Sequence, residues 1–209
     1  MRKKLDMTLY FITDSTCVPE ERFLPVVEAA CKGGASIIQL REKDKSTREY
    51  MRLATATHEI TARYGIPLII DDRVDVALAI GAEGVHVGQS DMPAHLARKL
   101  MGDDKIVGVT AKTVSQALEA YEQGADYLGC GAIYPTTTHV NTVITPVETL
   151  KDVVKAVPIP VNAIGGLNKD NIFVLKDSGI AGICVVSAIM KVADPETATR
   201  ELKQAFLKL

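Results

Sequence analysis

The sequence lacks a long apolar run, and this absence limits where the protein can work. Near its amino terminus, the basic stretch from Met1 to Lys4 is followed by a continuous apolar run of only Leu9 to Ile12. Such a run is too short for the core of a signal peptide and far too short to span a membrane. We therefore expect a cytoplasmic protein without a membrane partner.

Cysteine is scarce and shows no motif spacing. The four cysteines form no C-x-x-C pair, and two of them, Cys130 and Cys184, lie inside apolar runs. Buried free thiols in a reducing compartment are therefore expected. The sequence also contains no His/Cys cluster with zinc spacing, no Walker loop and no G-x-S-x-G nucleophile motif.

Positive charge is not in excess either. Lysine and arginine number 24, aspartate and glutamate number 26, and the net charge is −2. Non-specific nucleic-acid binding needs a basic surface, so we expect no nucleic-acid partner. Any site for a phosphorylated small molecule must then be local. The sequence leaves open a homo-oligomer.

Strand-like apolar runs alternate with helical patterns along the chain. A glycine, usually followed by alanine, closes a helical pattern and opens an apolar run at four places, which are Gly34, Gly81, Gly124 and Gly179. Four further runs lie between these marks: Leu9 to Thr13, Pro67 to Asp72, Lys105 to Ala111, and Pro160 to Gly166. Helices are predicted over 20–33, 46–64, 73–81, 93–102, 113–124, 147–157, 170–179 and 194–209. Ser46 and Glu49 have capping-box spacing, and Asp194-Pro195 is a helix-start signal.

This alternation predicts a parallel sheet, and eight units in 209 residues fit a single (β/α)8 TIM barrel domain over residues 1–209. An open Rossmann-type sheet is the alternative. Its glycine fingerprint would follow the first strand, whereas Gly165-Gly166 follows the seventh.

The second strand carries the most informative pattern. Gln39, Arg41 and Lys43 occupy alternate positions, so in a strand their side chains point to one face. Ile38 and Leu40 then face the opposite way, into apolar packing. An amide and two cations on a buried strand are costly to desolvate unless they bind something anionic. The planar donors of arginine and the compact charge of lysine suit a phosphate group.

In a (β/α)8 barrel the active site lies at the carboxyl ends of the strands. In strand order these ends carry Gln39, Arg41 and Lys43; Asp71 and Asp72; Gln89, Ser90 and Asp91; Thr110 and Lys112; Pro135 to His139; Gly165 and Gly166; and Val186 and Ser187. Basic, acidic and hydroxyl groups are thus predicted around one mouth.

Each of these groups has a structural alternative. Asp72 and Asp91 could hold Mg²⁺ together with phosphate oxygens, or could cap the helices that follow them. Gly165-Gly166 and Ser187 could bind a phosphate at the last two strands, or form a tight turn. The threonines after Pro135 could donate to a ligand or form an exposed loop. His86 alternates within a strand and could be a packed barrel residue.

Together these motifs resemble one family, thiamine phosphate synthase, also called thiamine phosphate pyrophosphorylase. The resemblance runs from Ile12-Thr13-Asp14 to Val186-Ser187-Ala188-Ile189. It is carried by Gln39-Leu40-Arg41-Glu42-Lys43, Asp72-Arg73-Val74-Asp75-Val76-Ala77, His86-Val87-Gly88-Gln89-Ser90-Asp91, Pro135-Thr136-Thr137-Thr138 and Ala163-Ile164-Gly165-Gly166.

The resemblance implies a (β/α)8 transferase of thiamine biosynthesis. It would join 4-amino-2-methyl-5-(diphosphooxymethyl)pyrimidine to a thiazole phosphate, carboxylated or not, giving thiamine phosphate and pyrophosphate. The implied chemistry is a dissociative substitution in which Mg²⁺ and cations neutralise the leaving diphosphate, and the thiazole nitrogen captures a pyrimidine-stabilised carbocation. Catalysis would be mostly positioning and electrostatic stabilisation.

The resemblance also implies roles for individual residues. The pyrimidine diphosphate would contact Gln39, Leu40, Arg41, Glu42, Lys43, Asp71, Thr110 and His139, of which Arg41, Lys43 and Thr110 would be catalytic. The thiazole phosphate would contact Thr136, Thr137, Thr138, Gly166, Val186 and Ser187. A single Mg²⁺ would be held by Asp72 and Asp91.

Three positions depart from the family pattern: Asp71 stands where asparagine is frequent, Thr110 where serine is frequent and His139 where lysine is frequent. Two other functions are the alternatives. A thiazole tautomerase resembles this chain but uses a histidine after the sixth strand's glycine, where this chain has Ala132. A non-catalytic barrel that binds a phosphorylated ligand is the other, since this fold hosts many functions.

Overall fold

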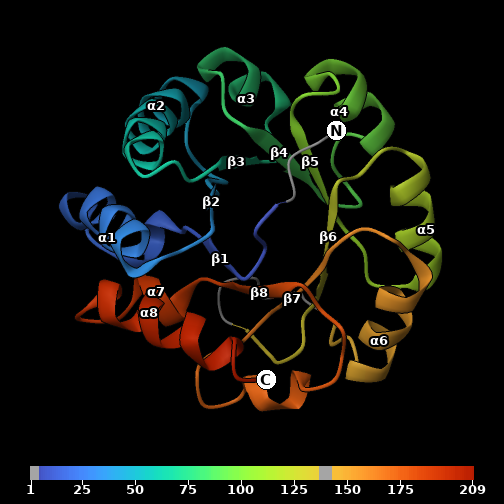
Figure 1. The fold of residues 1–209 in the computed structure, drawn as a ribbon. Coiled ribbons are helices and arrows are strands. Elements are labelled where there is room, and N and C mark those ends of the chain that lie inside the picture. Colours follow the sequence, from blue (N-terminus) through green and yellow to red (C-terminus); the bar gives the residue numbers. More distant parts are fainter. Residues whose placement is uncertain (1–4, 137–142) are drawn as a thin grey trace.

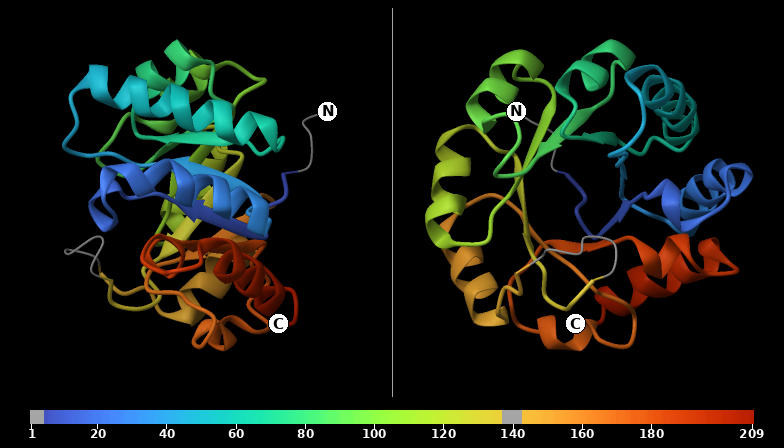
Figure 2. Two further views of the ribbon diagram at one scale, coloured as in Figure 1. Left: turned by 90° about the vertical axis from the view of Figure 1, so that its left-hand side faces the viewer. Right: turned by 180° about the vertical axis from the view of Figure 1, so that it is seen from behind.

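Eight parallel strands close into a barrel surrounded by helices in the computed structural model, which describes residues 5–136 and 143–209 (Figures 1 and 2). The strands are β1 (Leu9–Ile12), β2 (Ile37–Leu40), β3 (Leu68–Asp71), β4 (Gly84–Val87), β5 (Ile106–Thr110), β6 (Tyr127–Gly131), β7 (Val161–Ile164) and β8 (Gly182–Val185). Each strand pairs with the next, and β8 returns to pair with β1 through Ile183 opposite Leu9. The closed barrel confirms the predicted (β/α)8 fold and excludes the open sheet.

The connections after most strands are helical, and together they form the outer ring seen in Figure 1. The α-helices are α1 (Glu20–Gly33), α2 (Thr47–Arg63), α3 (Val74–Ile80), α4 (Ala94–Met101), α5 (Val114–Glu122), α6 (Val147–Ala156), α7 (Ser187–Met190) and α8 (Pro195–Phe206). Two 3₁₀ turns, η1 (Ser15–Cys17) and η2 (Ile172–Leu175), accompany them. In the described ranges, no helix has the length and apolar character needed to cross a membrane.

The helix predicted over 170–179 is wrong, because only the short turn η2 forms there. Asn171 Oδ1 accepts from the Asn168 N–H at 2.9 Å, and Asn168 Oδ1 accepts from the Asp170 N–H at 2.9 Å. Such local bonds from asparagine side chains satisfy backbone groups without a helix and so compete with it. The four-residue helix α7 was not predicted.

The start and stop signals of the other helices are confirmed. Ser46 and Glu49 form a complete capping box at the start of α2, and Pro195 occupies the first turn of α8 after Asp194. The glycines that close the helical patterns adopt positive φ, as in Gly34 after α1, where a residue with a Cβ would be strained.

Two apolar clusters hold the barrel. The larger lies between strands and helices and includes Ile38 and Leu40, both fully buried. The smaller fills the barrel interior with Met7, Tyr10, Ile12, Ile37, Ile69, Tyr127 and Cys184. Because side chains alternate along β2, Gln39 lies on the interior face with Ile37. All four cysteines are free thiols, and all but Cys17 are buried.

Candidate active site

The predicted cation cluster lies where β2 ends. Gln39 is still in the strand and only 3% exposed, while Arg41 and Lys43 follow directly after it. Ile38 and Leu40 point into the outer core, as the alternation predicted. The strand therefore delivers one amide into the barrel and two cations to its mouth.

These cations are balanced by acids from the neighbouring strand. Lys43 Nζ lies 2.7 Å from Asp71 Oδ2 and also pairs with Asp72, while Arg41 Nε lies 3.9 Å from Asp71 Oδ2. Burial lowers the pKa of Lys43, but the two carboxylates outweigh it and raise the pKa. For Asp71, burial raises the pKa and Lys43 and Arg41 lower it, with a net rise. The acids therefore serve as counter-ions for the cations.

Asp72 and Asp91 do not cap the helices that follow them. Neither α3 nor α4 has a side-chain cap, and Asp72 adopts a left-handed backbone with φ 54°. Non-glycine residues in this conformation concentrate at functional sites. Asp91 instead closes the loop after β4, where its Oδ2 accepts from the Gly88 N–H at 2.7 Å.

Asp72 and Asp91 by themselves supply only part of the ligand set of a hard cation. They line one hollow of about 590 Å³, together with Arg73, Val74, Asp75, Leu78, Met92 and Leu100. Burial raises the pKa of Asp72, contact with Lys43 lowers it, and the charges of Asp71 and Asp91 raise it, with a net rise. A bound cation would relieve the repulsion among the three carboxylates. No three His, Cys, Asp or Glu side chains converge as a metal cage within residues 5–136 and 143–209. Mg²⁺ commonly uses one or two carboxylates plus substrate phosphates, so the pair is compatible with it.

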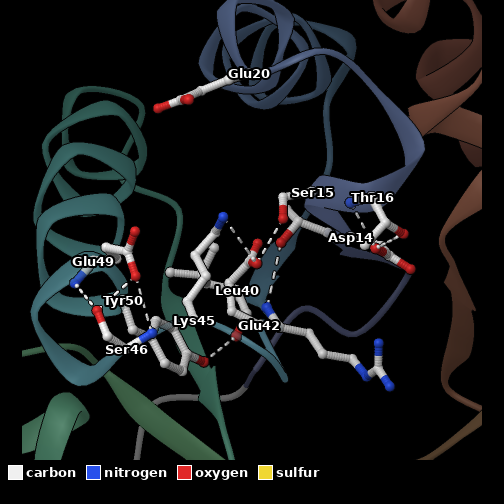
Figure 3. A network of polar contacts seen from close by, with 12 residues as sticks. Asp14, Ser15, Thr16, Glu20, Leu40, Glu42, Lys45, Ser46, Glu49 and Tyr50 are labelled. Atoms are coloured by element: carbon white, nitrogen blue, oxygen red, sulfur yellow. Dashed lines mark hydrogen bonds and ion pairs between the residues drawn. The ribbon is translucent and has the colours of Figure 1, made fainter.

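Two side chains predicted to contact substrate point elsewhere. Leu40 is buried in the outer core, and its carbonyl accepts from Tyr50 Oη at 2.9 Å. Figure 3 shows Glu42 turned toward Ser15, whose Oγ donates to Glu42 Oε2 at 2.6 Å, and toward Lys45 at 3.8 Å. Burial raises the pKa of Glu42. Any substrate contact of these two residues would therefore have to use backbone atoms.

Thr110, the last residue of β5, belongs to a line of hydrogen bonds through the barrel. Its Oγ1 lies 2.9 Å from His86 Nε2, and His86 Nδ1 lies 3.0 Å from Tyr127 Oη. Tyr127 Oη lies 2.8 Å from Tyr10 Oη, which accepts from Gln39 Nε2 at 2.9 Å. Burial lowers the pKa of His86 to about 4, so its ring is neutral.

The two tyrosines of this line were not among the residues predicted from the sequence, and for His86 a packed position in the barrel was the alternative considered. A usable signal was present, because Tyr10 is the residue with a polar group in the otherwise apolar run from Leu9 to Ile12, and a buried tyrosine hydroxyl usually finds a hydrogen-bond partner. Gly108 was a second signal, since glycine inside a strand often marks a close approach. A Cβ at Gly108 would lie 2.1 Å from Tyr127 Cζ.

The glycine pair after β7 has a clear packing role. A Cβ at Gly165 would lie 2.4 Å from Ala132 Cβ, and one at Gly166 would lie 2.8 Å from the Pro135 carbonyl oxygen. Both glycines also have positive φ. They let the loop after β7 pack against the loop after β6, with the Tyr134 N–H donating to the Gly165 carbonyl at 3.0 Å.

The remaining predicted thiazole-side residues are only partly described. Thr136 is half-buried, Val186 follows β8 and the exposed Ser187 begins α7. Thr137, Thr138 and His139 lie outside the described residues. Strand order places the described ones on the β6 to β8 side of the mouth, beside Gly166.

Comparison with known proteins adds independent information. A family model described as thiamine monophosphate synthase matches residues 9–189. A protein of Methanobrevibacter smithii named thiamine-phosphate synthase is 49% identical over 202 residues, which cover 97% of this chain and 96% of the relative. A Streptococcus pneumoniae protein named thiamine-phosphate synthase 2 is 52% identical, with 97% and 94% covered. The solved structure of thiamine phosphate pyrophosphorylase from Pyrococcus furiosus superposes with a TM-score of 0.89 at 39% identity, covering 98% and 97%.

Proposed function

This chain belongs to the thiamine monophosphate synthase family, and on that premise we propose how its barrel mouth performs the reaction. Its activity is that of a thiamine-phosphate synthase, a transferase of thiamine biosynthesis that acts on phosphorylated small molecules. Relatives near half identity over almost the whole chain carry that name. The tautomerase and the non-catalytic barrel are therefore set aside.

The cluster of Arg41, Lys43, Asp71 and Asp72 is the observation that carries the site assignment. We place the diphosphate of the pyrimidine substrate against Arg41 and Lys43, where Lys43 would exchange its contacts with Asp71 and Asp72 for phosphate oxygens. Charge-assisted hydrogen bonds of this kind contribute about 1.5–3 kcal/mol each. Asp71 would then face the pyrimidine.

Asp72 and Asp91 would hold Mg²⁺, which when bound would supply positive charge to the diphosphate oxygens. Support comes from their common hollow and from the absence of a capping role for either carboxylate. Lys43, which pairs with Asp72, would add a second positive charge to the same oxygens.

The thiazole phosphate would occupy the opposite side of the mouth. Gly166, Val186, Ser187 and Thr136 are assigned to it because their strands end there. Thr137, Thr138 and His139 stay predictions. The exposed Ser187 hydroxyl would donate to the phosphate.

The reaction needs no nucleophile from the protein. The bond between the pyrimidine methylene carbon and the diphosphate oxygen breaks, and its electron pair leaves with pyrophosphate. Arg41 and Lys43 stabilise that charge as it develops. The thiazole nitrogen then donates its lone pair to the carbon and forms the new bond. Thr110 and Gln39 hold the pyrimidine so that its methylene carbon lies in line between the leaving diphosphate oxygen and the thiazole nitrogen, and the reacting atoms meet without solvent reorganisation.

The test uses the purified protein with the pyrimidine diphosphate and thiazole phosphate, with Mg²⁺ and then with EDTA. Metal-dependent thiamine phosphate and an equal amount of pyrophosphate support the assignment. Parallel assays with carboxylated thiazole phosphate identify the preferred acceptor. Arg41→Met should abolish turnover, whereas Arg48→Met, on the exposed part of α2, is the matched control. Full activity of Arg41→Met would overturn the placement of the diphosphate.

Two broader expectations accompany this proposal. We infer that residues 1–209 work as one domain, because all eight strands close a single barrel. We also expect a cytoplasmic location, in keeping with free cysteine thiols. Sedimentation of the purified protein would decide whether it forms a homo-oligomer.

A further inference from the structure

Five side chains form a continuous line of hydrogen bonds across the barrel interior, which we call the interior chain. It runs from Gln39 through Tyr10, Tyr127 and His86 to Thr110, with four successive contacts of 2.9, 2.8, 3.0 and 2.9 Å. It therefore joins two residues of the proposed pyrimidine site, one on β2 and one on β5.

The direction of the interior chain follows from counting protons. Gln39 Nε2 can only donate, so Tyr10 Oη accepts from it and has its own proton to place. Tyr127 Oη is the other polar atom that Tyr10 Oη contacts among the described residues. If Tyr127 donated to Tyr10 instead, the buried Tyr10 proton would lack an acceptor, which is costly. Tyr10 therefore donates to Tyr127.

The same count fixes the tautomer of His86. Tyr127 accepts from Tyr10, so its proton goes to His86 Nδ1. A neutral imidazole that accepts at Nδ1 carries its proton on Nε2. His86 Nε2 then donates to Thr110 Oγ1, which leaves the Thr110 hydroxyl proton free for donation to another acceptor.

Packing holds the interior chain in this arrangement. Tyr10 and Tyr127 are 1% and 0% exposed, and their rings meet edge to face with centroids 5.7 Å apart. The Tyr127 ring lies directly over Gly108, where any Cβ would collide with it at 2.1 Å. These buried aromatic side chains leave little freedom for the hydroxyls to find other partners.

We propose that His86 is a positioning residue that fixes Thr110 as a hydrogen-bond donor to a ring nitrogen of the pyrimidine, with Tyr127 and Tyr10 holding His86 in its Nε2–H form. This inference rests on the proposed function, in which Thr110 contacts the pyrimidine. An aminopyrimidine offers ring nitrogens as acceptors, so a fixed donor selects the orientation of the ring. The methylene carbon is thereby aimed at the thiazole.

A double-mutant cycle tests the proposal. Tyr127→Phe and His86→Leu should each lower kcat/KM for the pyrimidine diphosphate about tenfold, the loss of about one ordinary hydrogen bond. The KM for the thiazole phosphate should not change. On a Thr110→Val background, neither substitution should lower kcat/KM further. His86→Gln, which keeps a donor near the Nε2 position, should restore part of the loss, and Tyr121→Phe on the exposed face of α5 is the matched control.

A direct readout does not depend on activity. Nitrogen chemical shifts of the His86 ring should show the Nε2–H form in the free protein near pH 7, and a shift toward a mixture in Tyr127→Phe. An Nδ1–H form in the unaltered protein would overturn the inference, even if the His86 variants failed to fold.

The kinetic outcomes separate the two proposals. If Thr110→Val keeps full kcat/KM, the placement of the pyrimidine at Thr110 fails and the inference fails with it. If Thr110→Val is impaired but His86→Leu lowers kcat/KM equally on both backgrounds, the inference alone is overturned, because His86 would then act independently of Thr110.

Discussion

The buried imidazole of His86 makes a quantitative prediction about acid stability. Burial lowers its pKa from 6.5 to about 4, an effect that nearby Asp91 opposes and Lys43 adds to. At about 1.4 kcal/mol per pH unit, this difference corresponds to roughly 3 kcal/mol. The folded protein binds the proton less well than the unfolded chain does. The contribution is therefore complete above pH 6.5 and is lost as the pH falls toward 4.

The assay is urea unfolding of the protein and of His86→Gln at several pH values between about 7.5 and about 4.5. Other groups titrate in both proteins, so the difference between the two stability curves isolates the imidazole. The free energy of unfolding should fall more steeply with acid in the unaltered protein, with the gap between the curves narrowing by roughly 2–3 kcal/mol over this range. His95→Gln, which removes an exposed histidine, is the matched control. Parallel curves for the protein and His86→Gln would refute the reasoning.

Three further outcomes are expected. Lys43→Met should tighten Mg²⁺ binding, measured by calorimetry without diphosphate, because the substitution frees Asp72 from its ion pair. The same substitution should lower kcat/KM for the pyrimidine diphosphate by roughly a hundredfold. Unchanged Mg²⁺ affinity would contradict the placement of the metal. Gly108→Ala should lower the free energy of unfolding by about 1–3 kcal/mol, since its Cβ would meet Tyr127; an unchanged urea midpoint would contradict it. Asp91→Asn should keep the bond to the loop backbone, and hence the unfolding midpoint, but lose Mg²⁺-dependent turnover; retained turnover with the same metal requirement would show that Asp91 is no ligand.

Sequence patterns predicted the barrel because its signals are local. Alternation of strand and helix sets a parallel topology, and glycines such as Gly34 and Gly81 end helices by their own backbone preference. The segment after β7 was wrongly predicted to be a helix, for a reason that is also local but that hydrophobic periodicity does not take into account. Asn168 and Asn171 bond nearby backbone groups there and replace a helix with a turn.

The candidate site was predictable in part. The two-residue period of β2 predicted that Gln39 points into the barrel and that Arg41 and Lys43 lie at its mouth, because this pattern depends on one strand alone. The pattern did not reveal that Glu42 turns away, because that depends on Ser15 in η1, 27 residues earlier in the sequence. Nor did it reveal the interior chain, whose tyrosines are 117 residues apart in sequence and meet only after the barrel closes.

The contact between Gly108 and Tyr127 also bears on how such barrels diversify. While a tyrosine stands at position 127, any side chain at position 108 collides with its ring, so selection should keep glycine there. A lineage that replaced the tyrosine with a smaller residue would release position 108 in turn. The two positions are therefore expected to change together. A homologue with a larger residue at position 108 should lack the tyrosine at position 127 and the hydrogen bonds made by its hydroxyl.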